Sequence, residues 1–150
     1  MTIRWRIAAV SLLMTAHLSA SDLPPIEQQI ARHIDGRRAA AIDLLERSVN
    51  IPSATENHEG VRRVGELYAA ELKPLGFDTT WVNQDEVGRA GHLVAEHRGT
   101  KGTRVLLIGH LDTVLQGEPF RREGRRGYGS GASDMKAGNA IVIEAIRALH

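Results

Sequence analysis

A run of apolar residues that ends in Gly-His-x-Asp is the feature that most constrains this chain. Residues 104–109 are nearly all apolar, as expected for a strand that is buried on both faces of a sheet. His110 and Asp112 follow it directly. In open α/β sheets, ligands bind beyond the carboxyl ends of the strands. The pattern therefore predicts an α/β domain with a polar site at the end of this strand.

Helical and extended patterns alternate along the rest of the chain. Apolar residues recur at helical spacing over residues 26–49, where Gly36 would divide the helix into two, over 59 to 72 or 75, and over 135–150. Gly76 is the expected stop of the second helix. Residues 77–82 and 92–97 are further candidate strands. Helices that flank strands favour a three-layer α/β/α domain.

The first twenty residues differ from the rest of the chain. Arg4 and Arg6 precede a mostly apolar stretch that ends in small residues, which is typical of a secretory signal peptide cleaved near Ala20. The apolar stretch is shorter than the about 20 residues that span a bilayer. We therefore expect residues 1–20 to be a signal peptide, residues 21–25 a linker, and the protein to be periplasmic or secreted. An uncleaved leader or membrane anchor is the alternative.

The composition argues against several classes of function. With 42% hydrophobic residues, 25% charged residues and a net charge of +1, the chain has the balance of an ordinary globular domain. We expect no nucleic-acid partner and no stable membrane insertion after signal cleavage. Two arginine pairs, at 121–122 and 125–126, form a local basic cluster, for which a solvated loop is expected. The chain has no cysteine, which excludes disulfides and thiolate chemistry.

The spacing of His110 and Asp112 is suited to a metal site. If the backbone stays extended, both side chains point to the same side. Asp112 can then accept the ring N–H of His110 and leave the other ring nitrogen for a metal, as carboxylates behind metal-bound histidines do. The alternative is a His–Asp hydrogen bond without a metal.

A second carboxylate follows a glycine-rich loop. Gly129 and Gly131 allow tight turning, and Asp134 stands just before a helix that opens near Lys136. From spacing alone, an N-cap role is favoured for Asp134. The alternative is a carboxylate that bridges two cations about 3.5–4 Å apart, which together clamp a water and a polarised carbonyl.

Residues 109–114 and 128–139 together resemble the dinuclear zinc exopeptidases. This family includes glutamate carboxypeptidases, aminoacylases, acetylornithine deacetylases and succinyl-diaminopimelate desuccinylases. Residues 45–53 and 71–77 extend the resemblance over nearly the whole mature chain. The export signal and the Tyr-Gly-x-Gly loop are most similar to periplasmic glutamate carboxypeptidases.

The resemblance implies a role for each matching residue. His110 would ligate one zinc ion, Asp134 would bridge two, and Asp112 would act in catalysis by orienting His110. The Asp134–Met135 peptide bond would be cis. The complete enzyme would use two zinc ions, with cobalt or manganese as alternatives, and metal-activated water. It would cleave a peptide or an N-acyl amino acid amide and release C-terminal glutamate.

Parts of the family pattern have no counterpart in the 150 residues. They are the Glu-Glu pair with the general base, a later acidic residue, a late histidine and the domain through which the complete enzyme would form a homodimer. We therefore expect residues 26–150 to be the N-terminal part of a metallopeptidase catalytic domain. The alternative is a truncated, inactive product with weak metal binding. In either case, residues 1–150 alone are expected to have negligible hydrolase activity.

Overall fold

The computed structural model describes residues 23–150, and the expected signal peptide lies outside the described residues. The first element, α1 (Pro25–Val49), is one uninterrupted helix with proline in its first turn. The division expected at Gly36 is therefore wrong. A Cβ atom at Gly36 would meet nothing within 4 Å, so this glycine faces open space and the helix continues through it. Among residues 23–150, no helix is long and apolar enough to cross a membrane.

The second helix, α2 (His58–Leu72), has a defined start and stop. The side chain of Asn57 accepts a hydrogen bond from the backbone N–H of Gly60 and caps the first turn. A short 3-10 turn, η2 (Lys73–Leu75), follows the helix. Gly76 then takes a left-handed conformation with φ of 77°, which confirms it as the expected stop.

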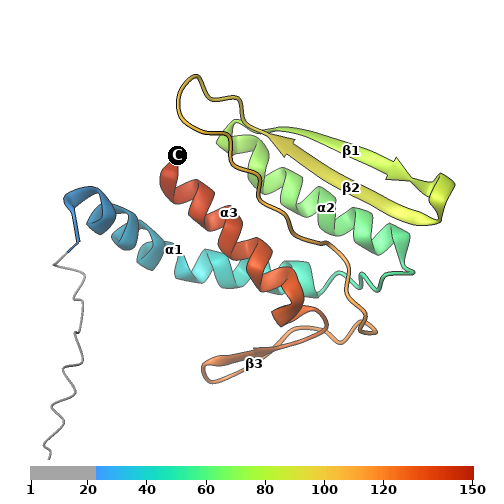
Figure 1. Ribbon diagram of the computed structural model, residues 1–150. Coiled ribbons are helices and arrows are strands. Elements are labelled where there is room, and N and C mark those ends of the chain that lie inside the picture. Colours follow the sequence, from blue (N-terminus) through green and yellow to red (C-terminus); the bar gives the residue numbers. More distant parts are fainter. Residues whose placement is uncertain (1–22) are drawn as a thin grey trace, which may run out of the picture.

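Two antiparallel strands form a hairpin against α2 (Figure 1). They are β1 (Asp78–Gln84) and β2 (Arg89–Glu96), joined by the 3-10 turn η3 (Asp85–Val87). The strands expected at residues 77–82 and 92–97 are therefore confirmed, with boundaries shifted by a few residues. Trp81 on β1 lies so close to Gly65 that a Cβ atom there would be 2.7 Å from the indole. Glycine at this position therefore lets the hairpin pack tightly on the helix.

Residues 104–109 do not form the buried strand that the sequence predicts. Val105, Leu106 and Ile108 are 74%, 80% and 82% exposed. The physical reason is that β2 pairs only with β1, so no described strand flanks this segment on either side. The described residues combine helices with two two-stranded sheets, which agrees with a mixed α/β class. The three-layer arrangement stays a prediction.

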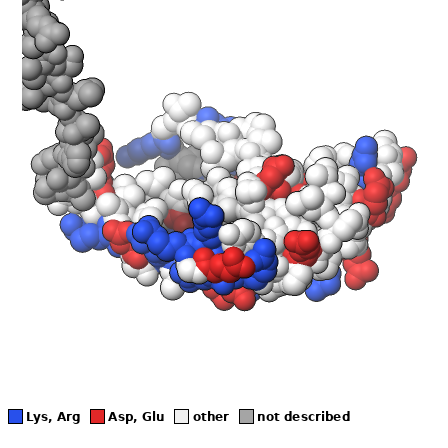
Figure 2. Space-filling view, turned by 90° about the horizontal axis from the view of Figure 1, so that it is seen from below, with Lys and Arg blue, Asp and Glu red and all other residues white. Residues whose placement is uncertain are grey.

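The arginine cluster lies on a second, short hairpin instead of the expected loop. Strands β3 (Arg121–Glu123) and β4 (Arg126–Tyr128) pair antiparallel, and all residues from 121 to 127 are exposed. The hairpin lies at the bottom of the molecule in Figure 1. The view from below in Figure 2 shows basic and acidic side chains next to one another on this face. The charges are solvated, as expected, although the backbone is a hairpin.

The last helix, α3 (Ala137–Leu149), packs across α1 (Figure 1). It follows an irregular turn, η4 (Ala132–Lys136). The buried core joins side chains from all three helices: Leu44 of α1, Val64, Tyr68 and Leu72 of α2, and Ala140 and Ile143 of α3.

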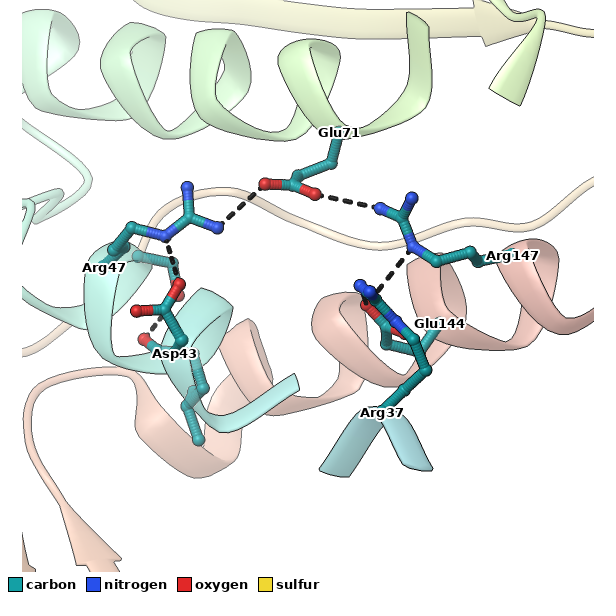
Figure 3. Close-up of polar contacts among 8 residues, drawn as sticks. Arg37, Asp43, Arg47, Glu71, Glu144 and Arg147 are labelled. Carbon is teal, nitrogen blue, oxygen red and sulfur yellow. Dashed lines mark hydrogen bonds and ion pairs between the residues drawn. The ribbon is translucent and has the colours of Figure 1, made fainter. Parts of the chain in front are cut away.

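A chain of ion pairs links the same three helices at one edge of this core (Figure 3). Glu71 of α2 forms ion pairs with Arg47 of α1 at 2.8 Å and with Arg147 of α3 at 2.9 Å. Glu144 of α3 accepts two hydrogen bonds from Arg37 of α1, at 2.8 and 3.0 Å. Bidentate pairs of this kind are the stronger form of arginine–carboxylate ion pair.

Replacing Glu144 by glutamine is expected to reduce stability and to flatten its dependence on acid pH. The hydrogen bonds from Arg37 outweigh burial and lower the pKa of Glu144. A lowered folded-state pKa adds stability above the ordinary value of 4.5, and this stability is lost as the pH falls through the folded-state pKa. At pH 7 we expect the free energy of unfolding to fall by about 1.5–3 kcal/mol, as for hydrogen bonds to charged groups. Urea unfolding at several pH values between 3 and 7 measures both effects. Equal stability of the two proteins at pH 7, or the same change of unfolding free energy with pH in both, would contradict this prediction.

Candidate metal centre

The structure brings together the three site residues that the sequence predicts. His110 and Asp112 follow the extended segment 103–109, and Asp134 lies in the turn before α3. The Nδ1 atom of His110 lies 2.9 Å from the backbone oxygen of Asp112 and 3.2 Å from its Oδ1. The Nε2 atom of His110 lies 3.0 Å from Oδ1 of Asp134. One imidazole therefore stands between two carboxylates that are 22 residues apart in the sequence.

The two carboxylates beside the imidazole raise the pKa of His110. Burial alone would lower the pKa of His110, but the hydrogen bond to Asp134 and the contacts with Asp112 outweigh it and raise the pKa. Burial would likewise raise the pKa of Asp112, but hydrogen bonds from Thr55 and His110 lower it. Two carboxylates that stabilise positive charge on the imidazole are electrostatically suited to stabilise a metal cation at the same place.

The carboxylate of Asp134 does not cap the helix, so the N-cap role favoured by spacing is wrong. No side chain caps the N-terminus of η4 or α3. Asp134 has a non-helical backbone, with φ of −135° and ψ of 94°, and its peptide bond to Met135 is cis, as the resemblance implies. The carboxylate reaches His110 because the chain has not yet entered the helix at this residue.

A buried lysine fixes the turn that carries Asp134. Lys136 is 1% exposed, and its Nζ donates hydrogen bonds to the backbone oxygens of Ser48 at 2.8 Å and Ile51 at 3.0 Å. Burial lowers its pKa to about 8. Sequence reasoning placed the helix opening here but missed this contact, since nothing in the local pattern distinguishes a buried lysine from an exposed one.

The loop between α1 and α2 supports the segment that carries Asp112. Thr113 donates its backbone N–H to Ser53 and accepts that of Thr55, which forms a parallel bridge between Ala54 and Thr113. The hydroxyl of Thr55 donates to Oδ2 of Asp112 at 2.6 Å. No sequence pattern predicts this pairing, because the partners are 57–58 residues apart and the loop is not periodic.

An amide from α3 completes the surroundings of His110. Asn139 donates from Nδ2 to the backbone oxygen of His110 at 2.7 Å. A Cβ atom on Gly109 would come within 2.4 Å of the Asn139 side chain. The glycine that precedes the histidine therefore leaves the room that this contact needs.

The donors fit part of a zinc site. Ligands about 2.0–2.2 Å from a tetrahedral zinc ion lie about 3.3 Å from one another. The 3.0 Å between Nε2 of His110 and Oδ1 of Asp134 would need to open by only a few tenths of an ångström. Two donors are fewer than the three or four that zinc requires. Within residues 23–150, no group of three or more His, Cys, Asp or Glu side chains is arranged to hold a metal.

Sequence comparison with known proteins shows that this chain belongs to a known family. Residues 106–150, which include all three site residues, match the model of peptidase family M20/M25/M40. This match confirms the resemblance seen in the sequence. Carboxypeptidase G2 of Pseudomonas sp. (strain RS-16) is 33% identical over 150 residues, which covers 96% of this chain. Succinyl-diaminopimelate desuccinylases of Novosphingobium aromaticivorans and Delftia acidovorans are 37% and 32% identical, over 69% and 70% of the chain.

The chain spans about a third of the length of these relatives. It covers 36% of carboxypeptidase G2 and 29% and 30% of the two desuccinylases.

Proposed function

We propose that this chain is the N-terminal part of a zinc-dependent exopeptidase or amidohydrolase that cleaves a peptide or N-acyl amino acid amide bond. The observation that carries the proposal is the 3.0 Å approach of His110 Nε2 to Asp134 Oδ1, with Asp112 behind the imidazole. The match of residues 106–150 to the peptidase family supports the same chemistry.

Each of the three side chains has a defined task in this proposal. His110 and Asp134 would hold the metal ions, with Asp134 shared between two. When bound, such ions polarise a carbonyl and lower the pKa of water towards neutrality. With a metal bound, Asp112 would accept the Nδ1–H of His110 and so fix the imidazole tautomer that leaves the Nε2 lone pair for the metal. Cobalt or manganese could occupy the same donors.

Glutamate release is the substrate preference that we propose. It is supported by the similarity to carboxypeptidase G2 over 96% of the chain and by the expected export signal. The test is hydrolysis by the protein expressed from its complete gene, with N-acyl glutamates, N-acetylornithine and dipeptides as substrates. We expect fastest turnover of N-acyl glutamates and loss of activity on chelation of the metal. Preference for another substrate would contradict the specificity, and chelator-resistant activity would contradict the metal.

The remaining donors, the general base and the homodimer are proposed to come from sequence outside these 150 residues. The three-layer sheet would be completed there as well. The second candidate is a truncated, inactive product, and the observation that favours it is that only two described side chains converge as donors. Reading the DNA beyond codon 150 separates the two, since an open frame with a Glu-Glu pair supports the enzyme.

Export to the periplasm or the medium is proposed from the N-terminal segment. Cells that express the complete gene are expected to release a mature protein that begins near Ser21, because the small residues before it suit a signal peptidase. N-terminal sequencing of the exported fraction measures this. Deleting residues 2–20 is the matched control and should retain the protein in the cytoplasm. Finding Met1 on the exported protein would contradict cleavage.

A further inference from the structure

We propose that Thr55 is a positioning residue of the metal centre, which holds Asp112 so that Asp112 in turn fixes His110. The inference rests on the proposed function, because it concerns how that centre is built. Thr55 lies in the loop between α1 and α2, far in sequence from the motifs that suggested the site.

The two oxygens of Asp112 are divided between two partners. Oδ2 accepts the hydroxyl of Thr55 at 2.6 Å, and Oδ1 lies 3.2 Å from Nδ1 of His110, which also lies 2.9 Å from the backbone oxygen of Asp112. A hydroxyl has a single proton to donate, and the oxygen of Thr113, at 3.5 Å, is a much poorer acceptor for it. The proton of Thr55 is therefore committed to Asp112. This contact prevents the carboxylate from rotating away from the imidazole.

Thr55 can serve as a fixed point because its own position is over-determined. Its backbone N–H donates to the oxygen of Thr113 at 3.0 Å, and Thr113 donates back to Ser53 at 2.9 Å. Threonine is branched at Cβ, so few χ1 rotamers are open to it. The hydroxyl therefore takes its place from backbone pairing between two segments, and it does not depend on the metal.

The same loop also reaches the other half of the centre. Lys136 donates to the backbone oxygen of Ile51, four residues before Thr55, and Lys136 closes the turn that carries Asp134. The α1–α2 loop thus contacts the segment with His110 and the segment with Asp134. Loss of the Thr55 hydroxyl would disturb only the His110 side of this arrangement.

Thr55→Val in the protein expressed from its complete gene is the direct test. Valine keeps the branched shape and removes the hydroxyl. Outer-shell partners of metal ligands are typically worth about 10–100-fold in metal affinity. Thr55 acts one step further out, so we expect the Kd for Zn²⁺ to rise about 10-fold, together with a changed visible spectrum of the Co²⁺ form.

Four companion variants decide what the change means. Thr55→Ser keeps the hydroxyl and should restore the Zn²⁺ affinity and the Co²⁺ spectrum. Thr80→Val, on the exposed side of β1, should leave both unchanged. If valine prevents folding, Thr55→Ala takes its place. In an Asp112→Asn background, the effect of Thr55→Val should shrink, because Thr55 acts through Asp112.

The outcomes separate this inference from the proposed function. Unchanged Zn²⁺ affinity and Co²⁺ spectrum in Thr55→Val, with metal bound by the parent protein, would overturn the role of Thr55 alone. Failure of Thr55→Ser to restore them would do the same. If the parent protein binds neither Zn²⁺ nor Co²⁺, the proposed function fails and the role of Thr55 fails with it.

Discussion

Replacing either His110 or Asp134 by alanine is expected to abolish metal binding and turnover in the protein expressed from its complete gene. The two side chains are the proposed donors that meet at 3.0 Å. Removing a donor takes away a bond to the metal itself. The loss of metal affinity should therefore exceed the about 10–100-fold typical of outer-shell partners. Metal content by mass spectrometry and initial rates on an N-acyl glutamate measure the two effects.

Matched controls for this experiment come from the β1–β2 hairpin. His92→Ala on β2 and Asp85→Ala in η3 remove the same types of side chain at exposed positions. Both controls should keep full metal content and activity. Full activity after His110→Ala or Asp134→Ala would remove the site assignment.

The 150-residue chain expressed by itself is expected to be poorly soluble or molten and to lack hydrolase activity. Val105, Leu106, Leu107 and Ile108 are between 57% and 82% exposed, side by side on one extended segment. An exposed, apolar segment whose backbone is unpaired is a template for aggregation. The physical expectation is strong binding of a hydrophobic dye, a broad thermal transition and self-association measured by light scattering.

Charged substitutions at Leu106 and Ile108 test whether this apolar segment causes the self-association. In the isolated chain, Leu106→Lys and Ile108→Lys should increase the monomer fraction, because they place charges on the exposed segment. In the protein from the complete gene, the same changes should be destabilising if the segment is a buried strand there. A sharp cooperative melt of a monomeric, unmodified 150-residue chain would contradict the prediction.

Local patterns predicted the elements whose stability is local. Apolar residues at helical spacing predicted α2. Gly76 predicted its end, because the left-handed backbone conformation that follows many helices favours glycine. The motif His110-x-Asp112 predicted an imidazole beside its carboxylate, because side chains two residues apart on extended backbone point to the same side, and the two side chains are in contact in the structure.

Contacts between distant segments could not be predicted in this way. The pairing of Thr55 with Asp112 and the burial of Lys136 against α1 depend on how the helices pack. The apolar run 104–109 was read as a buried strand, yet burial needs neighbours that no described strand provides. The role of Asp134 was ambiguous for the same reason, since a helix cap and a shared carboxylate stand at the same place in the sequence.

Anomalous diffraction at the zinc edge, from crystals of the complete protein grown with zinc, would locate the metal relative to His110 and Asp134. We expect a zinc ion with Nε2 of His110 and a carboxylate oxygen of Asp134 both about 2.0–2.2 Å away. We also expect Asp112 to accept the Nδ1–H of His110, with Thr55 bound to the other side of the Asp112 carboxylate. A zinc ion bound elsewhere, with His110 and Asp134 still hydrogen-bonded to each other, would contradict the proposed metal centre.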